Sequence, residues 1–278
     1  MEDLGVGAIH PQAPEFLSVV ALYSAPIDVD AALERLRTTW QIPVEGQWNE
    51  VAEDPQHPEL LTGKLYSFTE QGVQVLLTPM SGQLEVPAGT IPEHAFYLPI
   101  TFYAPLSGSN EGILAGEDTV ADSEILPLRH RKRMVSAHMV MTQLADALMQ
   151  ETAAIGIYRA ELGVVQPPEM ITELAPMLAQ GEVPVPMWIN VRTLRPDITT
   201  VGRTLGLPLF GHLDLEVRES VKNADDLYTL LADISNYIIA GDSYLLPGQT
   251  LGSSNGERLA LLQEVSPFDN SPVIRVMA

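Results

Sequence analysis

The chain has 278 residues, 46% of them hydrophobic and 18% charged, and its length lies between one large domain and two ordinary ones. Its 36 acidic and 15 basic side chains give a formal charge of −21, the opposite of what a general nucleic-acid or anionic-membrane binder needs. The chain contains no cysteine, which excludes disulfide bonds, thiol catalysis and thiolate metal sites.

The N-terminal residues do not resemble a targeting signal. They are acidic where a secretory signal would be basic, and no apolar segment follows them. No stretch approaches the roughly 20 apolar residues that cross a bilayer. We therefore expect a cytoplasmic protein with neither a membrane nor a nucleic-acid partner.

Hydrophobic patterning predicts the first elements in chain order. Residues 16–23 predict a largely buried strand. Asp28 is an expected N-cap, and the apolar residues after it recur at helical spacing. Residues 64–69 and 73–78 predict a hairpin. Residues 1–90 are therefore interpreted as a partial ferredoxin-like unit of the order βαββ.

A second unit is expected over the rest of the chain, 91–278. It begins with a strand at 94–103, a helix at about 133–151 and a strand at 154–158. A further helix is expected at 169–180. The segment from 105 to 128 is rich in Gly, Ser and acidic residues, and it predicts a mobile loop.

The C-terminal third predicts strands at 188–194 and 209–217, a helix capped by Asn223, and short strands at 249–252 and 259–265. With one helix counted as an insertion, the order from 94 onward is βαββαβ. The predicted fold class is α+β: two packed ferredoxin-like units with largely antiparallel sheets, forming one compact body.

Several short segments together resemble a bacterial family, the domain-of-unknown-function family numbered 4261. They are 204–207, 210–211, 215–217, the helix with Tyr228 and Tyr237, and 248–252. The resemblance extends over roughly residues 90–265, the carboxy-terminal two-thirds. It implies a bacterial cytoplasmic α+β protein and brings no established activity or catalytic residues.

Three polar side chains form the first candidate site. On a strand at 209–217, His212, Asp214 and Glu216 would share one face, at about 7 Å per step. An imidazole and two carboxylates in a row could help bind a divalent metal or act as general acid and base. The alternative is a half-exposed strand whose polar face contacts water. Glu216 occupies the position that the family resemblance includes.

Arginines form the other two candidates, both for anion contacts. Arg192 would share a strand face with Trp188, close in sequence to Arg195, and an arginine beside an aromatic ring suits a planar anion. Residues 129–133 hold Arg129, Arg131 and Arg133 at or before a helix N-terminus, where an anion would be favoured. Structural ion pairing is the alternative for both groups.

No motif predicts a cofactor or a metal site. The glycine-containing turns lack a phosphate-loop pattern, and no zinc-binding helix motif is present. His138 lies in an apolar helical run, where a hydrogen-bonded core histidine is expected.

These observations favour a non-enzymatic binding or interaction protein with an accessory or immunity-like role, whose acidic surface docks on a basic protein partner. The alternative is a small-molecule enzyme or sensor with a polar cleft that uses His212, Asp214, Glu216, Arg192 and Arg195. Convergence of these five side chains on one pocket, with a raised carboxylate pKa, would favour the enzyme. A homo-oligomer built through an exposed strand edge is a third hypothesis.

Overall fold

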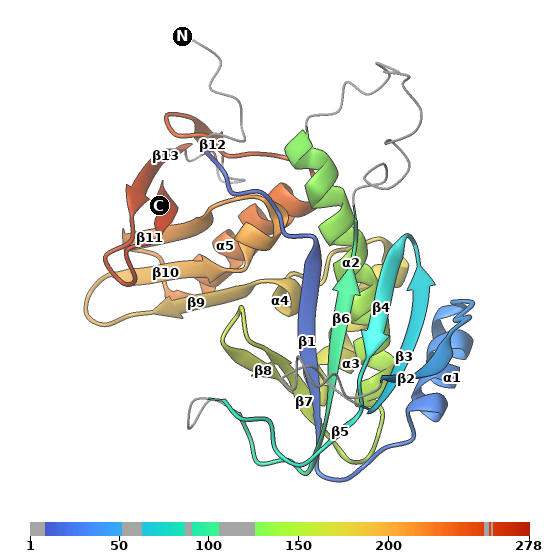
Figure 1. Ribbon diagram of the computed structural model, residues 1–278. Helices are drawn as coiled ribbons and strands as arrows, with labels where there is room; N and C mark the ends of the chain where they lie inside the picture. The colour runs from blue at the N-terminus through green and yellow to red at the C-terminus, as the bar shows by residue number, and fades with distance from the viewer. Residues whose placement is uncertain (1–8, 52–62, 87–90, 106–125, 253–255, 257) are drawn as a thin grey trace, which may run out of the picture. The chain divides into compact units, whose positions relative to one another are not determined.

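A computed structural model describes residues 9–51, 63–86, 91–105, 126–252, 256 and 258–278 (Figure 1). The chain divides into two compact units. Of the described residues, the C-terminal unit contains 9–14, 126–132 and 183–278, and the N-terminal unit contains 15–105 with its gaps and 133–182.

The N-terminal unit is a sheet with helices. Its strands run in the order β2-β3-β4-β6-β1-β7-β8, with β5 beside β6, and every pair is antiparallel. The strands are β1 (Phe16–Tyr23), β2 (Gln47–Val51), β3 (Gly63–Glu70), β4 (Val73–Leu77), β5 (Met80–Ser81), β6 (Phe96–Tyr103), β7 (Ala154–Arg159) and β8 (Val164–Gln166). The helices are α1 (Val29–Trp40), α2 (Leu126–Met149), α3 (Pro168–Leu174) and the 3-10 helix η2 (Ala175–Gln180).

Local signals determine where these elements begin. The Asp28 side chain accepts a hydrogen bond from the Ala31 N–H and caps α1 as expected.

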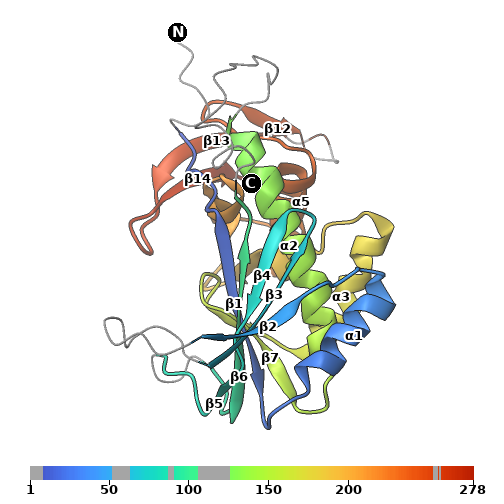
Figure 2. The ribbon, with the colours of Figure 1, turned by 45° about the vertical axis from the view of Figure 1, so that its right-hand side comes forward.

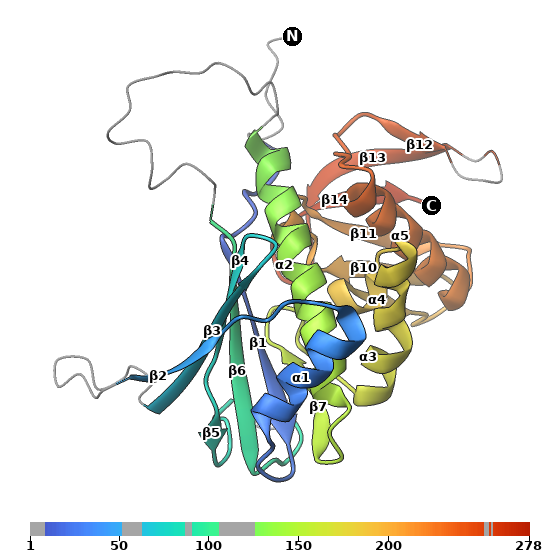
Figure 3. The ribbon, with the colours of Figure 1, turned by 90° about the vertical axis from the view of Figure 1, so that its right-hand side faces the viewer.

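The helices α1 and α3 and the later part of α2 lie on one face of the sheet (Figure 2; Figure 3). Trp40 of α1 donates a hydrogen bond from Nε1 to Asp146 of α2 at 2.9 Å, which joins the two helices.

The C-terminal unit is a second sheet of strand order β12-β13-β14-β11-β10-β9. Its neighbours are antiparallel except for the parallel pair β11 and β14. The elements are α4 (Val185–Trp188), β9 (Asn190–Leu194), β10 (Thr200–Leu205), η3 (Leu207–Phe210), β11 (Asp214–Ser220), α5 (Ala224–Ala240), β12 (Thr250–Gly252), β13 (Arg258–Val265) and β14 (Pro272–Met277).

Helix α5 packs on one face of this sheet, over β9 and β10. The Asn223 side chain caps it by accepting a hydrogen bond from the Asp226 N–H at 2.8 Å, as the sequence predicted. Gly202 in β10 is the point of closest approach, because a Cβ there would lie 2.8–2.9 Å from Leu231 and Leu227. The glycine therefore lets the helix lie directly on the strand.

The predicted α+β class and the largely antiparallel sheets are confirmed, whereas the ferredoxin-like arrangement is not. Strands on both sides of the boundary predicted near residue 90 belong to the same sheet. Most of the loop predicted over 105–128 lies outside the described residues. Among the described residues, no helix is both long and apolar enough to cross a membrane.

Two strand predictions were wrong at their starts, and one helix begins earlier than predicted. The expected strand at 188–194 is preceded by α4, which includes Trp188. The expected strand at 209–217 begins only at Asp214, because η3 and a turn occupy the residues before it. Helix α2 begins at Leu126, so the basic cluster at 129–133 lies inside the helix and not before its N-terminus.

Candidate functional site

The predicted polar row is buried. His212 and Glu216 are fully buried, and Asp214 is 8% exposed, so the interpretation of a polar face in water was wrong. The cause is the position of β11, which pairs with β14 on one edge and β10 on the other. His212 precedes the strand and therefore does not continue the row.

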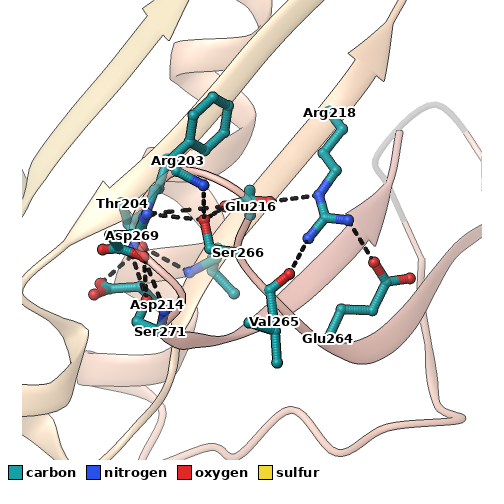
Figure 4. A network of polar contacts seen from close by, with 12 residues as sticks. Arg203, Thr204, Asp214, Glu216, Arg218, Glu264, Val265, Ser266, Asp269 and Ser271 are labelled. Carbon is teal, nitrogen blue, oxygen red and sulfur yellow. Dashed lines mark hydrogen bonds and ion pairs between the residues drawn. The ribbon is translucent and has the colours of Figure 1, made fainter.

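Glu216 lies at the centre of an ion-pair network (Figure 4). Its carboxylate accepts hydrogen bonds from Arg218 Nε and Ser266 Oγ, both at 2.5 Å. Arg203 Nη1 lies 3.9 Å away, and the other terminal nitrogen of Arg203 donates to Asp269 at 2.8 Å. The hydrogen bond from Arg203 lowers the pKa of Asp269 to about 2.

The network continues across the sheet. Arg218 donates to Glu264 at 2.7 Å, and Arg275 lies 3.3 Å from the other oxygen of the same carboxylate. Three acids thus meet three arginines: Glu216, Glu264 and Asp269 with Arg203, Arg218 and Arg275. The charges are balanced within the fold, which is typical of a structural network rather than a substrate site.

Asp214 is enclosed by groups of its own unit. Its Oδ1 accepts hydrogen bonds from Thr204 Oγ1 at 3.1 Å and the Leu207 N–H at 3.2 Å, while Thr204 Oγ1 accepts from the Leu215 N–H. Burial raises the pKa of Asp214 to about 7. Such a shift can mark a functional carboxylate. Here the carboxylate holds the turn at the start of η3, and it lines none of the grooves described below.

His212 forms a stacked pair with His10, a residue that the sequence analysis did not single out. The ring centroids are 4.3 Å apart. The Leu213 N–H donates to His10 Nδ1 and the Leu245 N–H donates to His212 Nε2, each at 3.1 Å. Both acceptor nitrogens must therefore be unprotonated, so the other ring nitrogens donate to the Leu245 and Leu213 carbonyls.

This pair belongs to the core of the C-terminal unit. Burial lowers the pKa of His10 to about 4 and that of His212 to about 3. All four ring nitrogens have backbone partners, which leaves none to act on a substrate. No sequence signal identified His10, because it lies about 200 residues from its partner.

Two arginines of the basic cluster at 129–133 bind backbone carbonyls of the protein itself. Arg131 is fully buried and donates to the carbonyl oxygens of Phe210, Ile238 and Ser243 at 2.6–3.0 Å. Its guanidinium lies 3.9 Å above the Tyr244 ring. Arg133 belongs to the other unit and donates to the Ala104 carbonyl oxygen. Arg129 is half-buried, and the acidic residues of the preceding segment up to 125, with which the cluster could form ion pairs, lie outside the described residues.

Arg192 lines a groove on β9 and β10. The groove has a volume of about 760 Å³. Arg195, predicted beside it, is exposed, donates to the Ile198 carbonyl oxygen at 3.2 Å and does not line the groove. The predicted aromatic neighbour Trp188 is buried, stacks on Phe210 and lies in α4, so it does not share a strand face with Arg192. The groove is lined by Val191, Arg192, Thr193, Leu194, Val201, Gly202, Arg203, Leu205, Phe268 and Asp269.

Two further grooves lie in the N-terminal unit. One of about 690 Å³ is lined by residues of β2, β3 and β4 and includes Glu45 and Glu70. The other, of about 500 Å³, includes Glu93 and His94. Within the described ranges, no group of three or more His, Asp or Glu side chains is arranged to hold a metal ion.

Comparison with protein families gives a match to the C-terminal unit. Residues 203–277 match the family described as Domain of unknown function (DUF4261). This confirms the family predicted from the sequence, although the matched segment is shorter than the predicted carboxy-terminal two-thirds. The DUF4261 segment contains the whole ion-pair network around Glu216, whereas Arg192, Arg131 and His10 lie outside it. Neither the curated proteins nor the solved structures gave a match.

Proposed function

We propose that the chain is a non-enzymatic binding protein, accessory or immunity-like in role, that docks a basic protein partner on an acidic surface. The observation that carries the proposal is the enclosure of the three candidate acid–base groups by the protein's own atoms. His212, Asp214 and Glu216 are buried and hydrogen-bonded to side chains and backbone of their own unit.

The alternative, a small-molecule enzyme or sensor, required five side chains to line one pocket. Of these five, Arg192 lines the groove on β9 and β10, and the other four do not. The raised pKa of Asp214 favours the enzyme, but its oxygen is engaged by Thr204 and Leu207. A reaction would need that carboxylate to reach a substrate, so the geometry favours binding over catalysis.

Helix α5 is a candidate for the acidic docking surface. It carries three aspartates, Asp225, Asp226 and Asp233, all exposed, and no basic residue. A net charge of −21 accelerates encounter with a basic protein through long-range attraction, and an acidic face gives that attraction a direction. These charges support a basic protein as the partner, with neither nucleic acid nor membrane.

The proposal predicts a partner whose association depends on salt and on α5. Affinity capture with the full chain at low salt should recover a basic protein, and its association rate should fall as the salt concentration rises. The double variant Asp225→Asn/Asp233→Asn should slow association about two- to fivefold at low salt. The control Glu45→Asn/Glu50→Asn removes two exposed acids near and in β2 and changes the net charge equally.

Three results would contradict the proposal: no basic partner, an association rate that salt does not change, or equal rates for both double variants and wild type.

The enzyme alternative is tested by a thermal-shift screen of metals, nucleotides and phosphorylated metabolites. A ligand that stabilises wild type and not Arg192→Ala would favour it, because Arg192 is exposed and its removal leaves the buried network intact.

A further inference from the structure

The groove of about 690 Å³ in the N-terminal unit lies where strand β2 begins. The chain reaches β2 from α1 through residues 41–46 (Figure 3). The groove is lined by part of this segment, by the end of β3 and by one residue of β4. All the lining residues belong to the N-terminal unit, so both walls of the groove are built by a single unit.

The wall that precedes β2 is fixed by contacts within its own unit. Val44 is buried, and its carbonyl oxygen accepts hydrogen bonds from Arg37 Nε at 3.1 Å and Nη2 at 2.9 Å. Gly46 packs directly on β3, because a Cβ there would lie 2.6 Å from the Ser67 carbonyl oxygen and the Tyr66 ring. A ligand that enters a preformed groove loses less binding free energy to ordering of the protein.

Most side chains that line the groove are polar and have no partner in the protein. Within the described part of the chain, no hydrogen bond or ion pair is made by the side chains of Glu45, Gln47, Ser67, Thr69, Glu70 and Gln74. The acids of the network around Glu216, in contrast, are all paired with arginines. The groove therefore presents hydrogen-bonding groups that only water or a ligand can satisfy.

The chemistry of these six side chains favours one class of ligand. Two carboxylates repel an anion, and no described residue that lines the groove is basic. The two amides and two hydroxyls donate as well as accept hydrogen bonds, whereas the carboxylates only accept. A cation would satisfy the acceptors and leave the donors without a partner. Hydroxyl groups of a neutral polyol both donate and accept, so they match the whole set.

An aromatic ring lies beside the polar groups. Gln74 is directly opposite Thr69 on β3 and Tyr103 on β6, so these three side chains share one face of the sheet. Tyr103 is 36% exposed, and Phe16, opposite it on β1, is 57% exposed. The C–H face of a sugar ring is apolar and packs on aromatic rings, while its hydroxyl groups bind neighbouring polar side chains.

We propose that this groove binds a neutral oligosaccharide, with hydroxyl groups held by the six polar side chains and a sugar ring packed on Tyr103. The ligand is an oligosaccharide because the volume of the groove exceeds that of a single sugar ring. The site lies in a different unit from helix α5, and the inference does not rest on the docking of a basic protein.

The first test titrates neutral trisaccharides into isotope-labelled full-length protein. The probes are maltotriose, cellotriose, mannotriose and triacetylchitotriose, each raised to about 10 mM so that a site with a Kd of about 1 mM is filled. At least one should shift the amide signals of 45–47, 67–70, 74 and 103 in a saturable manner and leave those of α5 unchanged. No saturable shift of these signals with any of the four would overturn the proposal.

The second test removes one hydroxyl group from the groove. Thr69→Val keeps a β-branched side chain on the strand and should weaken the trisaccharide that binds about three- to tenfold, because one hydrogen bond is lost. Thr250→Val is the matched control, since Thr250 is an exposed strand threonine of the C-terminal unit. It should leave the affinity unchanged. Equal affinities of the two variants would contradict the assignment of the groove.

The third test separates a sugar from an organic cation, with spermidine as the cationic probe. Glu45→Gln/Glu70→Gln replaces both carboxylates by amides that still bind hydroxyl groups. Binding of the trisaccharide should fall less than about fivefold in this variant and should not change with salt concentration. If spermidine alone shifts the groove signals, and the double variant and high salt both abolish that shift, the groove binds cations and the carbohydrate proposal is overturned.

Discussion

Asp214 is a buried acid whose proton affinity depends on the fold. Its pKa is about 7 in the folded chain because burial disfavours the charged form, against an ordinary value of 3.8. The folded state therefore binds the proton more tightly than the unfolded state does. The contribution of Asp214 to stability is fully present below about pH 4 and is lost as the pH rises through 7.

Asp214→Asn should stabilise the protein at pH 8 and not at pH 4. The amide remains neutral at both pH values, and its oxygen can still accept from Thr204 and Leu207. We expect the free energy of unfolding to rise by about 2 kcal/mol at pH 8, measured by urea denaturation. Asp233→Asn, on the exposed face of α5, is the control and should change little at either pH. An equal gain at both pH values would refute the explanation.

At the scale of elements, Arg131 connects the end of α5 to the last residue of η3. Its guanidinium donates to the carbonyl oxygens of Ile238 and Ser243 at the helix C-terminus, and to that of Phe210. The Ile238 carbonyl in the last turn of α5 also accepts from the Ser243 N–H at 3.2 Å, so Arg131 adds a second, charged donor to the end of the helix. Arg131 of the basic cluster is therefore buried and hydrogen-bonded to the backbone of its own unit.

Arg131→Met should destabilise the C-terminal unit by about 3–5 kcal/mol, because three buried carbonyl oxygens lose a charged donor. Hydrogen exchange of the amides in the last turn of α5 should accelerate. Lys132→Met, the exposed neighbour, should change the free energy of unfolding by less than about 0.5 kcal/mol. Similar losses for both variants would show that the cap does not matter.

At the scale of the whole molecule, two buried histidines, His10 and His212, make the free energy of unfolding depend on pH. The folded pKa values of His10 and His212 are about 4 and about 3, below the ordinary 6.5. The unfolded chain therefore binds these protons first as the pH falls. The stability that the neutral rings provide is complete above pH 6.5 and declines toward pH 4 and 3.

The double variant His10→Gln/His212→Gln should have a flatter dependence of stability on pH. Between pH 7 and pH 4.5, wild type should lose about 2–4 kcal/mol more than the variant, because glutamine does not take up a proton. Urea denaturation at several pH values measures both slopes. Parallel curves would mean that the histidine pair does not control acid unfolding. Asp214 acts in the opposite direction over the same range and is unchanged in both proteins.

The sequence by itself determined what depends on neighbours along the chain. Apolar patterning located β1 and the hairpin of β3 and β4, and the short polar side chains of Asp28 and Asn223 marked where α1 and α5 begin. These signals act over a few residues, so they can be recognised without the fold. The same local patterning predicted the α+β class, and the resemblance of short segments to a known family predicted the match at residues 203–277.

Only the tertiary structure decided the chemistry of the candidate residues. Alternation predicted a row containing Glu216, but its burial follows from the pairing of β11 with β10 and β14, and its partner Ser266 lies 50 residues away. The ring of His212 stacks on that of His10. Arg131 donates hydrogen bonds to carbonyl oxygens that follow it by about 80 to 110 residues in the sequence. Burial and charge pairing are properties of neighbours in space, so the sequence could not show that the candidate polar residues are buried and hydrogen-bonded.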